Sequence, residues 1–229
     1  MIGVVVPVHN EATLLGECLE SLVRATRDPA LRGEPAEVVA VLDACTDRSA
    51  AIAVRRGAQI VSLDARCVGA ARALGASFAI DAGARWIAFT DADCVVPENW
   101  LSAQIAADAD VTCGPVRIED WSAHPFGMQE RFVRLYGRAG AFHVHGANLG
   151  LAASAYRRSS GFPPLHKGEV EVLVASLARL GCRVAWNGSP AVITSARCES
   201  TIEGGFASAL RDLRGTCLAE LSATSAAAA

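Results

Sequence analysis

Short hydrophobic runs alternate with segments of helical length through the first half of the chain. Four runs rich in β-branched residues have the length of strands buried on both faces of a sheet. These runs are residues 2–6, 38–42, 60–63 and 86–90. Helices are expected from residue 11 onward, at 47–56, at 68–81 and after Pro97. The alternation predicts a Rossmann-like α/β fold, a parallel sheet flanked by helices.

The second half of the chain is less regular and predicts a smaller mixed region. Strands are expected at residues 111–118, 147–152 and 183–186, and helices at 126–136, 169–180 and 206–221. We expect a single domain over residues 1–221, built from the halves 1–118 and 119–221. The low-complexity segment 222–229 is expected to be a disordered tail.

Composition excludes several classes of protein. The 21 basic and 24 acidic side chains give a net charge of -3, which argues against a nucleic-acid partner. Lys167 is the sole lysine, so a Walker-type phosphate loop is excluded. The eight cysteines form no C-x-x-C element, which favours a reduced, cytoplasmic protein. We find no signal peptide and no uncharged run of about 18 apolar residues, so no integral membrane segment is expected.

Polar clusters follow three of the predicted strands, at residues 7–11, 43–47 and 91–93. Ligands of parallel sheets bind at these carboxyl ends of the strands. The first cluster contains no G-x-G-x-x-G, which disfavours NAD or FAD. An acidic site binds phosphates only through a divalent cation. Asp91 and Asp93 project to the same side of an extended segment, and their hard oxygens suit Mg²⁺ or Mn²⁺.

Five blocks of the sequence, in this order, resemble the family 2 glycosyltransferases with the GT-A fold. They are VVVPVHNEATLLGECLESL, VVAVLDACTDRSAAIA, ARCVGAARALGASFA, WIAFTDADCVVPENWL and HGANLGLAASAYRRSSGFPP. The resemblance covers roughly residues 2–195. It implies that residues 1–118 bind the nucleotide sugar and that residues 119–221 form the acceptor half.

The resemblance also implies which residues bind the donor, a UDP- or GDP-linked sugar. They are Pro7, His9, Asn10, Glu11, Asp43, Asp47, Gly69, Arg72, Asp91, Ala92 and Asp93. Asp43 would contact the base, and Arg72 would point towards the phosphates. Two of these acids also have simpler explanations, since Asp47 is a good helix cap and Glu11 suits the first turn of a helix.

A metal site at Asp91 and Asp93, holding Mn²⁺ or Mg²⁺, is the second implication. His143 and His145 alternate in the sequence and would project to one side of an extended segment, so His145 is a candidate third ligand. A pair of histidines in a loop is also explained by ordinary surface hydrogen bonds.

The position of the general base departs from the family pattern. The family usually carries Glu-Asp about a dozen residues before a glycine, and counting back from Gly181 places Glu169 and Val170 there. Valine cannot accept a proton, so Glu169 or Glu171 is expected to take over. Losing a general base typically costs about 10²–10⁴-fold in rate.

Three functions therefore stay open. The first is an inverting, metal-dependent glycosyltransferase that moves a sugar to a hydroxyl of a small-molecule or glycan acceptor. The second is a catalytically impaired nucleotide-sugar-binding protein, suggested by Val170. The third, a nucleotidyltransferase, is disfavoured because the chain lacks the glycine-rich N-terminal loop of that class.

Overall fold

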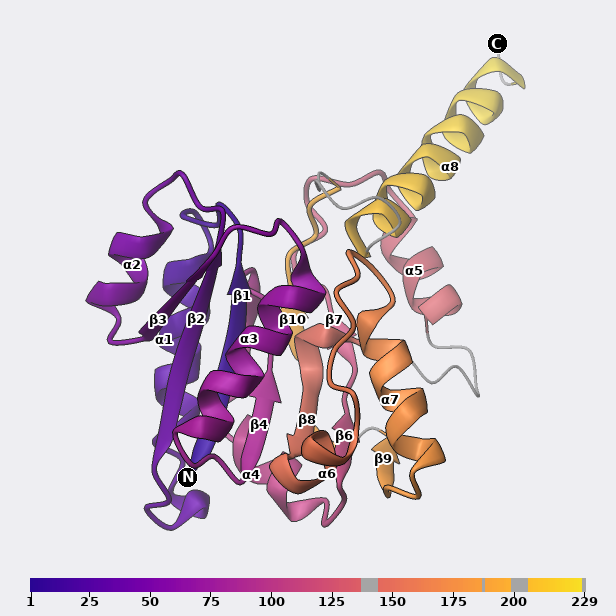
Figure 1. The fold of residues 1–229 in the computed structure, drawn as a ribbon. Helices are drawn as coiled ribbons and strands as arrows, with labels where there is room; N and C mark the ends of the chain where they lie inside the picture. The colour runs from indigo at the N-terminus through magenta and orange to yellow at the C-terminus, as the bar shows by residue number, and fades with distance from the viewer. Residues whose placement is uncertain (137–143, 187, 199–205, 228–229) are drawn as a thin grey trace. The chain divides into compact units, whose positions relative to one another are not determined.

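The computed structural model describes residues 1–136, 144–186, 188–198 and 206–227, the last seven of them by their backbone alone (Figure 1). Its contacts divide the chain into two compact units. The first unit joins Met1–Arg117 to His143–Thr194, and the second joins Ile118–Phe142 to Ser195–Ala229. Part of the expected acceptor half therefore packs with the first 117 residues of the chain.

A seven-stranded, mostly parallel sheet forms the centre of the first unit, as the sequence predicts. Its strands are β1 (Ile2–Val8), β2 (Ala36–Asp43), β3 (Gln59–Leu63), β4 (Trp86–Phe89), β6 (Val111–Cys113), β8 (Leu149–Ala152) and β9 (Val184–Trp186). Their order is β3-β2-β1-β4-β8-β6-β9. Only β8 runs antiparallel to its two neighbours in this sheet.

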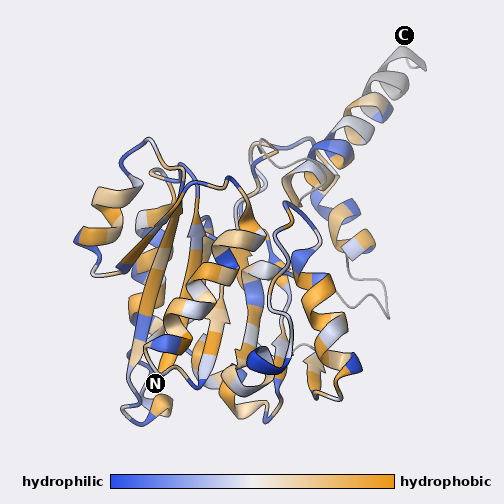
Figure 2. Ribbon diagram, viewed as in Figure 1, coloured by the Kyte–Doolittle hydropathy of each residue, from blue (hydrophilic) through white to orange (hydrophobic). Residues whose placement is uncertain are grey.

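The central strands are hydrophobic because helices cover both of their faces (Figure 2). Val4, Val5 and Val6 of β1 are fully buried. Helix α3 (Val68–Asp81) lies across β1 and β2 on one face, and α1 (Leu15–Ala25) lies on the other (Figure 1). Continuous apolar runs are typical of strands buried in this way.

The direction in which successive strands are added to the sheet reverses between β1 and β4. The chain passes from β1 to β2 and β3 on one side, then returns to β4 on the other side of β1. β1 pairs with β2 as far as Val8 and Leu42, but with β4 only as far as Val5 and Phe89. Pro7, which has no N–H to donate, lies beyond this last pair with β4. Such a topological switch point is where ligands of open α/β sheets bind.

A small three-stranded sheet also belongs to the first unit. It consists of β5 (Cys94–Val95), β10 (Val192–Thr194) and β7 (Val116–Arg117), in that order. The single strand predicted at residues 111–118 is wrong, because β6 and β7 belong to different sheets. The break falls at Gly114 and Pro115, where the N–H of Gly114 leaves the ladder and donates to the carbonyl of Asn148 at 2.9 Å.

The remaining helices of the first unit cover the edges and faces of these sheets. They are α2 (Ser49–Arg55), α4 (Trp100–Ala106), α6 (Ala153–Arg158) and α7 (Glu169–Arg179), with short 3-10 turns η1 (Pro29–Leu31) and η2 (Gly146–Asn148). The predicted helices at 68–81 and 169–180 are confirmed to within one residue. The inner face of α7 packs Val170, Leu173 and Leu177 into the main hydrophobic core.

The second unit contains α5 (Met128–Tyr136) and α8 (Phe206–Ala227). Its core is formed by Ile118, Met128, Leu210 and Cys217. Helix α8 continues past the predicted end at residue 221 because the segment is rich in alanine, the strongest helix former. Residues 228–229 of the predicted tail lie outside the described residues. No helix in the described part of the chain combines the length and apolarity needed to cross a membrane.

Candidate functional site

Side chains expected at the nucleotide fasten the loops after β1 and β2 to each other. Asn10 has a left-handed backbone (φ 55°), and its Oδ1 accepts from the N–H groups of Thr46 at 2.8 Å and Asp47 at 3.3 Å. The carboxylate of Asp47 accepts from the N–H groups of Ala12 and Ser49, both at 2.9 Å. Burial pushes the pKa of Asp47 upward, but the bonds from Ser49 and Ala12 lower it overall. Asp47 thus binds the first N–H of α2 and tethers the neighbouring loop, although the N-cap residue of the helix is Arg48 and not Asp47 as expected.

Three other donor-site candidates, Pro7 within β1 and His9 and Glu11 in the loop after it, lie at the same edge of the sheet. Pro7 and His9 are half-buried, and the ring Nδ1 of His9 donates to the carbonyl oxygen of Asp43 at 2.6 Å. Because a carbonyl only accepts, the proton of a neutral His9 ring lies on Nδ1, and Nε2 is the acceptor. Glu11 is half-buried, and its backbone N–H donates to Ser49 Oγ at 3.0 Å.

Asp43 holds the turn that leads into α3. Its side chain lies at the end of β2 and is 4% exposed. Oδ1 accepts from the N–H groups of Ala65 and Arg66, both at 2.8 Å, and Oδ2 accepts from the N–H of Cys67 at 2.7 Å. The structure thus gives this carboxylate a structural role that the sequence did not indicate. Its contact with a nucleotide base stays a prediction.

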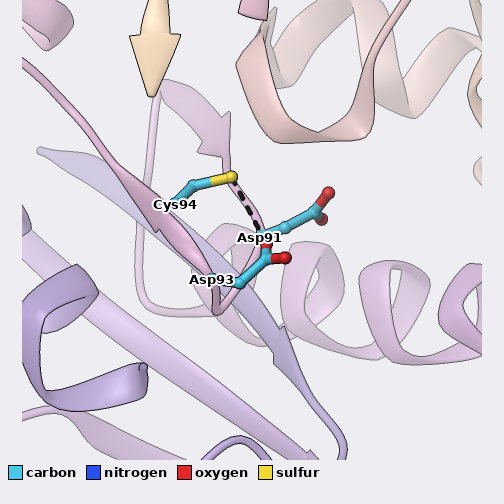
Figure 3. A group of neighbouring side chains, drawn as sticks. All are labelled: Asp91, Asp93 and Cys94. Atoms are coloured by element: carbon cyan, nitrogen blue, oxygen red, sulfur yellow. Dashed lines mark hydrogen bonds between the residues drawn. The ribbon is translucent and has the colours of Figure 1, made fainter. Parts of the chain in front are cut away.

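Asp91 and Asp93 follow β4 at the switch point, and their carboxylates project to the same side of the loop (Figure 3). Together with Cys94 they offer ligand atoms within 4.8 Å of one another. Cys94 is fully buried, and burial, reinforced by the neighbouring carboxylates, raises the pKa of its thiol well above the ordinary value. The thiol donates to Asp93 Oδ1 at 3.5 Å. The two carboxylates fit a hard cation such as Mn²⁺ or Mg²⁺, whereas a protonated thiol does not. Ala92 between them is buried.

Arg72, on α3, links this pair of acids to α7. Its side chain is 5% exposed, and Nη2 donates to Asp91 Oδ1 at 2.5 Å. Nη1 donates to Oε1 of Glu169, the first residue of α7. One guanidinium therefore joins the candidate metal site to one of the two candidate bases. The sequence places Arg72 in the donor site but does not indicate its contact with Glu169.

The two candidate bases lie in different environments. Glu169 is 4% exposed, and burial raises the pKa of its carboxyl, an effect that Arg72 opposes. Glu171 is exposed, and residues two apart on a helix lie on different faces. Val170, at the family position of the base, is 3% exposed and belongs to the hydrophobic core. Of the two glutamates, Glu169 is the one that contacts the residues of the candidate site.

Two glycines allow the backbone to approach this site closely. Gly69 donates its N–H to the carbonyl of Leu165 at 3.1 Å, and a Cβ at Gly69 would lie 2.2 Å from the carbonyl oxygen of Pro163. A Cβ at Gly146 would lie 2.2 Å from Nη2 of Arg72 and 2.3 Å from its Cζ. Gly69, expected at the donor, thus contacts the segment that precedes α7, and Gly146 covers the guanidinium.

His145 precedes η2 and is half-buried. Among the described residues, the close group of metal-ligating side chains is Asp91, Asp93 and Cys94, and His145 lies outside it. Its role as a third ligand stays a prediction. His143 lies outside the described residues.

Asn148 is an organising residue that sequence reasoning missed. It is fully buried, and its Oδ1 accepts from Trp100 Nε1 at 2.9 Å and Ser189 Oγ at 2.8 Å. Its Nδ2 donates to the carbonyls of Pro115 and Pro190, both at 2.9 Å. Four hydrogen bonds of one amide thus fix the turn that carries Gly146. The only sequence signal was its place inside the acceptor-side block.

Sequence comparison decides the family. Residues 3–159 match the sequence model described as glycosyl transferase family 2, a stretch of more than half the chain. The chain belongs to this family. The match extends from β1 into the end of α6 and includes Arg72, Asp91 and Asp93, while Glu169 lies beyond it. No curated protein is similar enough to this family 2 chain to count as a relative.

Solved structures with the GT-A fold resemble this family 2 member. S. aureus TarS 1–349 in complex with UDP-GlcNAc is 17% identical, with a TM-score of 0.66 over 90% of this chain and 61% of that one. The Pyrobaculum calidifontis mannosyltransferase PcManGT, with GDP-Man and Mn²⁺, is 20% identical, with a TM-score of 0.65 over 95% and 61%. Glucosyl-3-phosphoglycerate synthase from Mycobacterium tuberculosis, with Mn²⁺, UDP and phosphoglyceric acid, is 17% identical, with a TM-score of 0.56 over 83% and 68%. The chain thus spans about three fifths of the TarS 1–349 fragment and of the mannosyltransferase, and the likeness confirms the GT-A fold.

Proposed function

We propose that this protein is an inverting glycosyltransferase that moves a sugar from a nucleoside diphosphate to an acceptor hydroxyl. One observation carries the proposal: Arg72 brings the carboxylate of Glu169 to the pair formed by Asp91 and Asp93 at the switch point of the sheet. A transfer reaction needs a donor site and a proton acceptor side by side. In this family 2 chain, both are supplied by carboxylates that one guanidinium connects.

The reaction follows from these groups. The acceptor oxygen attacks the anomeric carbon in line with the bond to the diphosphate oxygen, that bond breaks, and the nucleoside diphosphate leaves with the electron pair. We assign the acceptor proton to Oε2 of Glu169, because Arg72 contacts Oε1. Asp91 and Asp93 would hold a divalent cation, which supplies Lewis-acid stabilisation of the leaving diphosphate. Burial raises the pKa of Glu169 above the ordinary value of a glutamate, which makes its carboxylate a stronger base.

The donor class is supported by the comparisons and by charge. The TarS and mannosyltransferase structures named above contain UDP-GlcNAc and GDP-Man, so a UDP- or GDP-linked sugar is proposed here. The carboxylates of Asp43, Asp91 and Asp93 repel a diphosphate unless a cation offsets their charge. Mn²⁺ is the first choice, because two of the three similar structures contain it.

Nucleotide binding and transfer are tested separately. UDP and GDP should raise the melting temperature in Mn²⁺ and not in EDTA, because a ligand of the folded state alone stabilises it by RT ln(1 + [L]/Kd). Transfer is measured as nucleoside diphosphate release from UDP-GlcNAc and GDP-mannose with a panel of sugar and phosphorylated acceptors. Glu169→Gln should keep the nucleotide-induced shift but slow release by about 10²-fold or more.

Glu171→Gln is the matched control, since it makes the same chemical change on the same helix at an exposed position. It should release nucleotide at the parental rate. Equal slowing in both variants would contradict the assignment of the base to Glu169. An equal shift in EDTA would contradict the role of the cation.

A second candidate function rests on Val170. The family's base position is filled by a core residue, which is what a binding protein derived from an enzyme would also show. Mn²⁺-dependent nucleotide binding without release from either sugar nucleotide, across the whole acceptor panel, would favour this nucleotide-sugar-binding protein over the enzyme.

A further inference from the structure

Each terminal nitrogen of the Arg72 guanidinium contacts a carboxylate, while the buried Nε has no hydrogen-bond partner among the described residues. Nη1 contacts Glu169 and Nη2 contacts Asp91, and the Arg72 side chain is 5% exposed. Glu169 is equally buried, whereas the side chain of Asp91 is 38% exposed. The bridge thus has a buried end at the proposed base and a partly open end at the proposed cation site.

The surrounding backbone prevents the guanidinium from turning away. Gly146 lies so close that an added Cβ would be 2.2–2.8 Å from Nη2, Cζ and Nη1. The turn of Gly146 is itself fixed by the four hydrogen bonds of the Asn148 amide. One turn before Arg72 on α3, Gly69 packs against the segment that leads to Glu169. Helix α3 therefore fixes both the carboxylate and the chain that carries it.

From this arrangement we propose that Arg72 is a positioning residue for Glu169, rather than a ligand of the donor phosphates. The proposal rests on the proposed function, in which Glu169 is the base. Because the guanidinium is a rigid planar fork, it holds the two carboxylates at a set separation and orientation. A single side chain thus sets the position of the proposed base, Glu169, relative to Asp91 in the proposed donor site.

The competing role for Arg72 follows from the family resemblance, which points it towards the diphosphate. The two roles differ in what they change. A phosphate ligand contributes to donor affinity, and its loss raises the dissociation constant. A positioning residue contributes to the geometry of the base, and its loss lowers kcat, by up to about 10²-fold for a displacement near 1 Å.

A double-mutant cycle with Arg72→Met and Glu169→Gln separates the two roles. Arg72→Met should lower nucleotide release from UDP-GlcNAc or GDP-mannose by about tenfold or more, with the affinity for UDP in Mn²⁺ within about threefold of the parent. The double variant should be no slower than Glu169→Gln, because both changes disable the same base. Arg72→Lys should recover part of the loss, since an ammonium keeps the charge but not the fork.

Stability provides a readout that needs no turnover. Arg72→Met leaves a buried carboxylate without its cation and should lower the melting temperature by about 6 °C or more. Adding Glu169→Gln should restore part of that loss. The control is the pair of Arg85 and Glu34, which form a bidentate ion pair outside the site, with Arg85 53% exposed. Arg85→Met should lower the melting temperature by less than about 4 °C and leave release unchanged.

Two results would overturn the positioning role. One is a weakened UDP affinity in Arg72→Met with kcat retained, and the other is additive losses of melting temperature in the cycle. A parent that binds UDP with Mn²⁺ but releases no nucleotide would refute the transferase instead. In that case the melting temperatures of the single and double variants, together with the UDP affinity, still decide whether Arg72 pairs with Glu169 or binds the donor phosphates.

Discussion

Substituting Gly146 by alanine adds one methyl group at a tight contact of the candidate site. The new Cβ would lie 2.2 Å from Nη2 and 2.3 Å from Cζ of Arg72. The guanidinium cannot yield, because it is buried and bound to Asp91 and Glu169. Overpacking of this kind costs about 1–3 kcal/mol. At about 2–4 °C for each kcal/mol in a chain of this size, the melting temperature should fall by about 2–12 °C.

Gly215→Ala is the matched control. It lies within α8, and no described atom is within 4 Å of the Cβ it would gain. Because alanine is favoured over glycine inside a helix by about 0.5–1 kcal/mol, this variant should be as stable as the parent or more stable. Thermal unfolding of both variants, followed by circular dichroism, gives the comparison. If Gly146→Ala has the same melting temperature as the parent, the claim that the guanidinium of Arg72 is held in a fixed position is refuted.

Three further substitutions test other parts of the structure. Val170→Asp restores the family's carboxylate in the sequence but buries it in the hydrophobic core. The variant should therefore be less stable than the parent by at least about 2 kcal/mol in urea titrations, and it should restore no activity. Asp43→Asn removes an acceptor from the turn before α3 and should cost about 1–3 kcal/mol; unchanged stability would contradict the structural role of this carboxylate. Asp93→Ala should abolish the Mn²⁺-dependent thermal shift by UDP with little change in the melting temperature of the free protein, and a retained shift would remove Asp93 from the proposed cation site.

The first half of the fold could be predicted because its strands are buried on both faces. Such strands appear as continuous apolar runs, as in β1 and β2, and the alanine-rich α3 has the length of a helix. The second half could not be predicted to the same depth. β5 and β7 are two residues long, too short to leave a periodic pattern, and the apolar pattern does not separate β7 from β6. β8 pairs antiparallel with strands distant in the sequence, and no local signal indicates that pairing.

The candidate site was predictable only where it follows a strand. Asp91 and Asp93 come directly after a buried run, so their place at the carboxyl edge of the sheet follows from the topology. The contact between Arg72 and Glu169 depends on how α7 packs against the N-terminal elements, and nothing in either segment specifies it. The sequence could not choose between Glu169 and Glu171, because the choice depends on which face of α7 is buried. The structure supplies that information, because Glu169 is buried and Glu171 is exposed.

The amide of Asn148, with all four of its hydrogen bonds made, marks a part of the acceptor side that tolerates little change, and another part carries no such restriction. Residues 145–148 cannot change shape without breaking hydrogen bonds to α4, to the link between β6 and β7 and to the link between β9 and β10. The side chains of residues 164–167, in the segment that leads to Glu169, are exposed and follow no such constraint. A library of variants restricted to positions 164–167 would therefore change the side chains in the segment before the proposed base, Glu169. It would leave the hydrogen bonds of Asn148 unchanged. New acceptor specificity is best sought there, with the donor site held constant.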